Sequence, residues 1–353
     1  MKRIIINGRF LTQKITGVQR YARELTGELD KLVDRDELEI AVPPEANSIP
    51  MYRNIKVVKV GRLHGIAWEN ISFPIYVKRK NAVSLNLCNV APLISPGIVC
   101  IHDVKIKVRP KDFSRKFLIW YKMLFLNETK RAKKIITVSE FSKREIIKYY
   151  GVKPERISVI PNAWQHWERI SCDERILYKH NLQKGEFFFA MASLEPNKNF
   201  KWIAEAALKY PEHIFVAAGS IDAKVFSKGL GFDCPENMKL VGYITDEEAK
   251  TLMRDCKAFL FPTFYEGFGL PPIEALSAGC RNIFVSDTDV MHEIFGDSVN
   301  FVEPFTVGED ILRGNNAFDA RSVLARYSWK KSARLLYRLL SEMNSNNGDA
   351  HVS

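Results

Sequence analysis

The stretch FPTFYEGFGLPPIEALSAG, residues 261–279, is the most informative part of the sequence. An apolar strand, Ala258–Phe261, runs into the glycine-containing turn Glu266–Leu270, where the backbone can approach a ligand closely. The pair Pro271-Pro272 then begins a helix, where a missing backbone N–H costs nothing. A strand, a glycine turn and a helix N-terminus together predict a binding site for an anion such as a diphosphate.

Two carboxylates bracket this anion site. Glu266 precedes the turn and Glu274 lies one turn inside the helix, so hydroxyls on either side of a diphosphate can donate to them. A sugar nucleotide has this layout of sugar hydroxyls, diphosphate and ribose hydroxyls. The alternative is an ordinary helix cap with two solvent-facing glutamates. One glutamate considered alone would favour that alternative. Both together, with the glycine turn and the double proline, favour the ligand site.

Strands and helices alternate on both sides of this segment. The alternation predicts an α/β protein with two parallel sheets, each covered by helices on both faces. Such sheets bind ligands at the carboxyl ends of their strands. The predicted strands are 2–6, 39–42, 55–60, 82–87, 97–101, 134–138, 157–160, 187–192, 214–218, 239–241, 258–261 and 282–285. The predicted helices include 17–32, 114–133, 139–150, 200–208, 246–255, 272–278 and 329–343.

The length of 353 residues suits two domains of this kind. We expect an N-terminal Rossmann-like domain at residues 1–163 and a C-terminal one at 183–327. The irregular residues 164–182 are predicted to be the linker. A C-terminal helix, 328–343, is expected to pack back toward the N-terminal domain, before a tail at 344–353. The two sheets are expected to face each other across a cleft.

The composition narrows the function classes. No apolar run is long enough to cross a membrane, and MKRIIINGRF reads as a first strand rather than a signal peptide, which predicts a cytoplasmic protein. The six cysteines show no C-x-x-C pair, so neither a zinc site nor a disulfide framework is expected. The net charge of +11 points to an anionic partner.

The positive charge is concentrated between Lys105 and Lys148, with fourteen Lys or Arg against four Asp or Glu. Aromatic side chains are interleaved: Phe113, Phe117, Trp120, Tyr121 and Phe125. One interpretation is a solvated helix face; the other is a surface that lies on anionic lipid headgroups. No nucleic-acid-binding signature accompanies the charge, so a nucleic-acid partner is not expected.

The stretch EGFGLPPIEALSAG closely resembles the E-x7-E signature of the retaining glycosyltransferases of family 4, which have the GT-B fold. Glu266 and Glu274 are eight positions apart, as in that signature. The stretch ASLEPNKN, residues 192–199, resembles the loop that carries basic residues for the diphosphate in this family. Further similar stretches cover most of the chain: 137–142, 159–162, 241–243, Gly17-Val18 and the region around Trp329.

The resemblance implies roles for named residues. Lys198 is expected to be the main cation on the diphosphate, Glu266 to hold the donor sugar and Glu274 the ribose hydroxyls. His102, at the end of an apolar strand, resembles a histidine placed near the donor sugar, either catalytic or only sugar-binding. The other expected donor-binding residues are Gly17, Ser193, Glu195, Gly242, Tyr243, Gly267, Phe268, Gly269 and Leu270.

Several positions depart from the family pattern. Ser193 stands where the family usually has an arginine, and Arg9 or Arg20 are candidates for the missing cation. Ala163 replaces a glycine, and a single Gly17 replaces a double glycine. The sequence Asp287-Thr288-Asp289 matches a metal-binding motif of another fold, but we expect Asp289 to cap a helix that begins at Val290. The Gly267-Phe268-Gly269 stretch lacks the third glycine of a dinucleotide fingerprint.

The resemblance further implies transfer with retention and without a metal or other cofactor. With no evident carboxylate nucleophile, we expect a front-face reaction in which the leaving diphosphate oxygen helps deprotonate the acceptor. The expected acceptor is a lipid-linked saccharide of bacterial O-antigen, capsule or exopolysaccharide assembly, bound by a peripheral enzyme on the inner face of the plasma membrane. GDP-mannose is the first choice of donor, with UDP- and dTDP-sugars open. The alternatives are a sugar-nucleotide epimerase and a non-catalytic protein that binds nucleotide sugars or docks on a membrane.

Overall fold

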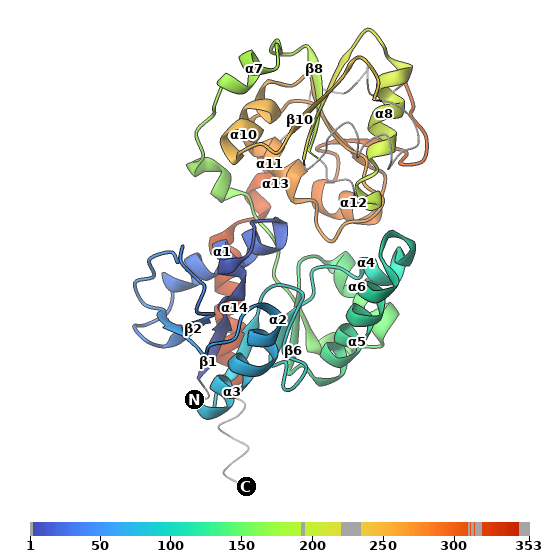
Figure 1. Cartoon of the computed structure of the whole chain (residues 1–353). Helices are drawn as coiled ribbons and strands as arrows, with labels where there is room; N and C mark the ends of the chain where they lie inside the picture. The colour runs from blue at the N-terminus through green and yellow to red at the C-terminus, as the bar shows by residue number, and fades with distance from the viewer. Residues whose placement is uncertain are drawn as a thin grey trace. The chain divides into compact units, whose positions relative to one another are not determined.

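The computed structural model describes residues 3–191, 195–219, 234–309, 311, 314 and 320–345. The chain divides into two compact units, one formed by Met1–Asn162 with Ser328–Ser353 and the other by Ala163–Tyr327. Each unit is built around a parallel sheet (Figure 1). Among the described residues, no helix is both long enough and apolar enough to cross a lipid bilayer.

The sheet of the first unit has seven strands in the order β3-β2-β1-β4-β5-β6-β7, and every neighbouring pair is parallel. Four of its inner strands, β1, β2, β4 and β5, are buried along their whole length, as expected for a sheet covered on both faces. The strands are β1 (Ile4–Asn7), β2 (Leu38–Val42), β3 (Lys56–Lys59), β4 (Val83–Asn86), β5 (Ile98–Cys100), β6 (Lys134–Thr137) and β7 (Ile157–Val159).

Helices connect these strands, and the C-terminal helix belongs to the same unit. Helix α14 packs on α1, where the rings of Tyr21 and Trp329 meet edge to face at 5.9 Å. The Ser332 hydroxyl donates to the carbonyl of Pro161 at 2.8 Å. The helices are η1 (Gly8–Thr12), α1 (Gly17–Asp30), α2 (Gly65–Ala67), η2 (Trp68–Ser72), α3 (Phe73–Arg79), α4 (Lys105–Val108), η3 (Pro110–Asp112), α5 (Arg115–Arg131), α6 (Glu140–Tyr150), η4 (Pro154–Arg156) and α14 (Trp329–Ser345).

The sheet of the second unit has six strands in the order β10-β9-β8-β11-β12-β13, again all parallel. Its strands are β8 (Phe187–Met191), β9 (Ile214–Ala218), β10 (Met238–Gly242), β11 (Ala258–Phe261), β12 (Ile283–Ser286) and β13 (Asn300–Val302). Its helices are η5 (Gln165–Arg169), α7 (Arg175–Lys179), η6 (Pro196–Lys198), α8 (Phe200–Lys209), α10 (Asp246–Asp255), α11 (Leu270–Ala278), α12 (Asp289–Phe295) and α13 (Ala320–Arg326).

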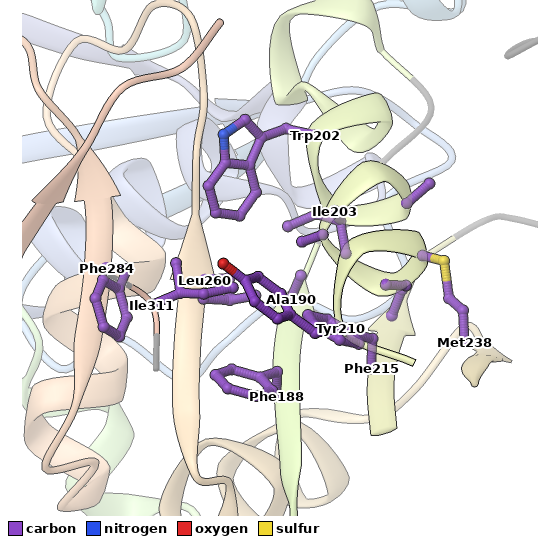
Figure 2. Packing of buried hydrophobic residues seen from close by; sticks show 14 of the residues in the cluster. Phe188, Ala190, Trp202, Ile203, Tyr210, Phe215, Met238, Leu260, Phe284 and Ile311 are labelled. Atoms are coloured by element: carbon purple, nitrogen blue, oxygen red, sulfur yellow. The ribbon is translucent and has the colours of Figure 1, made fainter. Parts of the chain in front are cut away.

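The core of this second unit lies between the sheet and α8 (Figure 2). Trp202 on α8 is buried, and its indole N–H donates to the carbonyls of Glu303 and Thr306, both at 3.0 Å. The Phe188 and Phe215 rings, on adjacent strands, are stacked at 5.0 Å. The aromatic core therefore fixes β8, which precedes the Pro196–Lys198 turn in the sequence.

The predicted fold class is confirmed: both halves are parallel α/β sheets. Two local predictions were wrong or incomplete. Thr288, not Asp289, is the N-cap of α12, and Asp289 is the first residue of the helix. Strand β13 and the helical segment Gly65–Arg79 were not predicted.

In both sheets the strand order reverses once, between β1 and β4 in the first unit and between β8 and β11 in the second. In open parallel sheets, ligands bind outside the carboxyl ends of the strands at such a reversal. The topology therefore selects the segments after β8 and β11, and those after β1 and β4, as the places to search for sites.

Candidate active site

The loops after β8 and β11 bring two predicted site residues together. The Lys198 ammonium lies 2.8 Å from Glu266 Oε1, with 24% of the lysine side chain and 16% of the glutamate side chain exposed. The same ammonium lies 5.5 Å from the centre of the Phe261 ring. The pair is thus half-buried at the reversal of the sheet, where a ligand can reach both charges.

Two buried asparagines hold these loops against each other. Asn197 Nδ2 donates to the Tyr265 carbonyl at 2.7 Å, and the backbone carbonyl of Asn197 accepts from the Phe264 N–H at 2.9 Å. Asn199 has a positive φ of 53°, and its Nδ2 donates to the Pro262 carbonyl at 2.9 Å. Neither asparagine was predicted as a site residue, although both stand beside Lys198 in the quoted PNKN stretch. Their role is to fix the register of the two loops and so the position of the Lys198–Glu266 pair.

The glycine turn opens helix α11 as the anion site requires. Gly269 is the N-cap, with φ of 93°, and a Cβ on it would lie 3.0 Å from Met291 Cε. The helix begins at Leu270, two residues before the predicted Pro272. Because both prolines lack an N–H, the amides at this helix N-terminus that have no acceptor within the helix are those of Gly269 and Leu270. Few backbone N–H groups are therefore available to a ligand at this helix N-terminus, and one of them belongs to Leu270, the first helical residue.

Glu274 does not face solvent. Its Oε1 lies 2.8 Å from His166 Nε2, and only 5% and 1% of the two side chains are exposed. His166 belongs to η5, within the residues 164–182 that were predicted to be a linker. No periodic pattern marks His166 in the sequence, and its partner Glu274 is 108 positions away. The contact of His166 with the predicted site residue Glu274 is therefore one that only the structure reveals.

The other predicted donor-binding residues of the second unit differ in their exposure. Phe268 is buried and meets the Tyr327 ring edge to face at 5.1 Å. Tyr243 is largely exposed, and Gly242 has a positive φ of 71° with open space where a Cβ would be. Glu195 is exposed before η6, and Gly267 is buried. Ser193 lies outside the described residues.

His102 belongs to the first unit and is buried after β5. Its Nε2 lies 2.9 Å from the Leu87 carbonyl, and since a carbonyl oxygen only accepts, Nε2 carries the proton. Burial lowers the pKa of His102, so the ring is neutral near pH 7 and Nδ1 is a hydrogen-bond acceptor. A neutral ring in this tautomer can accept a hydrogen bond from a sugar hydroxyl.

The reversal between β1 and β4 carries a cavity of about 170 Å³ within the first unit. The Arg9 guanidinium pairs with Glu69 at 2.5 Å, and Asn7 Nδ2 donates to the other Glu69 oxygen at 2.9 Å. Burial raises the pKa of Glu69, and the Arg9 charge opposes that rise. Arg9, a candidate for the missing diphosphate cation, is thus already paired within its own unit. Gly17 is exposed at the first residue of α1, next to the cavity residues Thr16 and Val18.

In the Asp287-Thr288-Asp289 motif, the first carboxylate is paired with a histidine. Asp287 Oδ1 lies 2.6 Å from His292 Nε2. Over the described ranges, the His, Cys, Asp and Glu side chains form no group of three or more that could hold a metal ion.

Comparison with known proteins assigns the two halves separately. Residues 173–314 match the family model "Glycosyl transferases group 1", and residues 81–164 match "Glycosyltransferase Family 4". The chain is 26% identical over 255 residues to the O-antigen chain mannosyltransferase RfbU of Salmonella typhimurium, covering 70% of this chain and 69% of that protein. It is 25% identical over 367 residues to the serotype-specific mannosyltransferase WbdA of Escherichia coli, covering 94% of this chain but 44% of WbdA.

Solved structures agree on the fold. Sucrose-phosphate synthase from Thermosynechococcus elongatus superimposes with a TM-score of 0.72 at 14% identity, covering 98% of this chain and all of that one. WaaG, a glycosyltransferase involved in lipopolysaccharide biosynthesis, gives 0.62 at 14% identity, covering 94% of each chain. The two family models show that the chain belongs to the group 1/family 4 glycosyltransferases, a retaining and metal-independent family, and the two Rossmann-like sheets and the solved structures agree with its GT-B fold.

Proposed function

We propose that this chain transfers a hexose, with mannose as the first candidate, from a nucleotide sugar to a lipid-linked saccharide. The observation that carries the donor assignment is the Lys198–Glu266 pair at the β8–β11 reversal, beside the N-terminus of α11. A basic group, a carboxylate and a free helix amide within one site match the diphosphate and hydroxyls of a sugar nucleotide.

In this proposal the ion pair separates when the donor binds. The diphosphate takes the Lys198 ammonium, and Glu266 Oε1 is released to accept hydrogen bonds from the sugar hydroxyls. The Leu270 N–H caps a phosphate oxygen, and Glu274 accepts from the ribose hydroxyls. Glu266 thus keeps Lys198 neutralised in the free enzyme and binds the sugar in the complex.

The proposed reaction proceeds on one face of the sugar. The bond from the anomeric carbon to the diphosphate oxygen breaks, and the bond to the acceptor oxygen forms on the same face. The acceptor hydroxyl proton passes to the departing diphosphate oxygen, whose charge Lys198 stabilises. Neutral His102 accepts a hydrogen bond from the sugar through Nδ1 and takes no proton.

The relatives support mannose as the transferred sugar, because RfbU and WbdA are both named mannosyltransferases. The test is a thermal-shift panel of GDP, UDP, dTDP and ADP with their common sugars, on the wild type and Glu274→Ala. We expect one nucleotide to raise the melting temperature and Glu274→Ala to abolish the rise. No shift with any nucleotide would refute the donor site. Conversion of the donor to an isomer without an acceptor would replace transfer by epimerisation.

The outer face of α5 supports an acceptor in a membrane. Ile119 and Met123 are 70% and 46% exposed, with exposed cations beside them at Arg115, Lys116, Lys122 and Lys130. Ile94, 73% exposed, follows Leu93, whose carbonyl accepts from Asn127 of α5 at 2.9 Å. Exposed aliphatic side chains ringed by cations are typical of a surface that inserts among anionic headgroups.

The predicted aromatic residues of this region contribute less to the exposed surface than the aliphatic ones: Phe117 is 38% exposed, and Phe125 is buried. Phe113, Phe117 and Tyr121 stack on one another at 5.1 and 4.2 Å. The exposed aliphatic residues are therefore the ones to change. We expect Ile119→Ser/Met123→Ser to lose sedimentation with phosphatidylglycerol vesicles at low salt, and Leu208→Ser, an equally exposed residue on α8, to keep it. Wild-type protein that stays in the supernatant would refute the membrane assignment.

A further inference from the structure

We propose that His166 is the positioning residue of the donor site, holding the Glu274 carboxylate so that one oxygen is presented to the ribose hydroxyls. This rests on the proposed role of Glu274 in donor binding. The contact is 2.8 Å between His166 Nε2 and Glu274 Oε1, and both side chains are almost completely buried. His166 lies outside the E-x7-E signature, and the signature does not imply a role for it.

The histidine is fixed by contacts that do not involve Glu274. Its neighbour Trp164 donates from Nε1 to the Leu324 carbonyl at 2.9 Å, and Gln165 Nε2 donates to the Tyr327 carbonyl at 3.0 Å. On the other side, Lys250 Nζ donates to the Trp167 carbonyl at 2.8 Å. The short helix η5 is therefore anchored at both ends, and the His166 ring is a fixed point against which the longer Glu274 side chain is oriented.

The carboxylate needs such a fixed point. A glutamate side chain turns broadly about its last bond, so either oxygen can face a ligand. His166 binds Oε1 and thereby defines the carboxylate plane, which leaves Oε2 for a donor outside. Within the described part of the chain, the Glu274 side chain is hydrogen-bonded to His166 through Oε1. The Ser277 hydroxyl donates to the backbone carbonyl of Glu274 and not to its carboxylate. A buried carboxylate with one oxygen satisfied is pre-organised for a diol.

The inference is specific because Glu274 is proposed to bind only the ribose hydroxyls of the donor. If His166 acts through the carboxylate, its loss weakens only the part of the affinity that comes from the ribose hydroxyls. A role in packing alone would weaken the binding of every nucleotide to the same degree. The ratio of affinities for a nucleotide with and without its ribose hydroxyls therefore separates the two roles.

The experiment is titration calorimetry of the full chain with GDP, UDP, dTDP and ADP, and with the 2′,3′-dideoxy form of whichever binds best. The variants are His166→Phe, which keeps a ring but has no donor, and His166→Gln, which keeps an N–H. Trp164→Phe is the matched control, because it removes a hydrogen bond of the same segment without touching Glu274.

We expect His166→Phe to weaken the ribonucleotide on the order of tenfold, as loss of a supporting partner does elsewhere, and to leave the dideoxy form unchanged. His166→Gln and Trp164→Phe should keep most of the wild-type preference for the ribonucleotide. In turnover, the donor KM rises in His166→Phe while kcat changes little.

Equal weakening of both nucleotides, or a full preference retained in His166→Phe, would overturn the positioning role while leaving the donor site in place. If His166→Phe does not fold, His166→Leu takes its place and is read in the same way: loss of the ribose preference supports the positioning role, and equal weakening of both nucleotides or a retained preference overturns it. A wild type that binds no nucleotide refutes the donor site itself, and the positioning role with it.

Discussion

Lys198→Met is the substitution that most directly tests the donor site. It removes the charge and keeps the length of the side chain, including the stem near the Phe261 ring. In the free protein it also breaks the 2.8 Å ion pair with Glu266. Because both side chains are partly exposed, solvent screens this pair, and its loss should cost about 0.2–1 kcal/mol of stability.

The effect on binding is larger, since the ammonium contacts a multiply charged ligand. A hydrogen bond to a charged group contributes about 1.5–3 kcal/mol. Subtracting the ion pair that the ligand must first displace leaves roughly 0.5–2.8 kcal/mol, or about 2- to 100-fold in Kd. On the reaction itself, where charge develops on the leaving oxygen, loss of one stabilising group costs on the order of 100- to 1,000-fold in kcat.

The assay pairs calorimetry of a nucleoside diphosphate with turnover of the corresponding sugar nucleotide. The free nucleoside is the control ligand, and its affinity should stay at the wild-type value. Lys198→Met/Glu266→Gln should bind the diphosphate more tightly than Lys198→Met, because the single variant leaves an uncompensated carboxylate in the anion site. Wild-type Kd and kcat in a folded Lys198→Met protein would refute the assignment of Lys198.

Three further predictions follow from the structure. Gly269→Ala should destabilise the second unit by roughly 1–3 kcal/mol in urea unfolding, because φ is 93° and the new methyl meets Met291 at 3.0 Å; Gly279→Ala, with φ of 92° and open space, should cost less, and equal losses would contradict the close approach. Burial raises the pKa of Glu128 well above its usual range, so its contribution to stability is full below the unfolded pKa of about 4.3 and is lost as pH rises. Glu128→Gln still accepts from the Ala91 N–H, so its stability relative to wild type should grow from about pH 5 to about pH 8; a constant difference would mean that this carboxyl ionises normally. His102→Ala should lower turnover by on the order of tenfold and His102→Gln should restore most of it, since Gln can donate to Leu87 and accept from the sugar; unchanged turnover in His102→Ala would remove His102 from the site.

The fold was largely predictable because the strands of a parallel sheet are continuous apolar runs. Phe187–Met191 and Ile214–Ala218 carry that signal clearly, and both are inner strands of the second sheet. Strand β13 was missed because Asn300–Val302 is short, begins with a polar residue and lies at the sheet edge. The segment Gly65–Arg79 was missed because it joins a short helix, a π-turn and a second helix, so no single period runs through it.

The site was predictable only where its residues are close in sequence. Glu266 and Glu274 lie on one turn and helix, and their spacing predicted both as site residues. The contact of Lys198 with Glu266 joins residues 68 positions apart and rests on the order of the strands, which brings β8 next to β11. The cavity residues Asn7 and Glu69 are 62 positions apart and gave no motif at all.

The least predictable part of the site is also the most informative about how it is built. The segments where the chain enters and leaves the second unit are hydrogen-bonded to each other, through Trp164 with Leu324 and Gln165 with Tyr327. Both also contact the segment that carries Phe268 and Glu274, since His166 binds Glu274 and the Tyr327 ring packs on Phe268. Residues 164–182 were predicted as a linker because a connection needs no periodic pattern. A segment that is held by one buried hydrogen bond also lacks a periodic pattern, because that bond constrains the type of one residue and not of its neighbours. Such a segment therefore looks like a linker in the sequence. Irregular segments that contain buried histidine or tryptophan should therefore be examined as parts of a site before they are assigned as linkers.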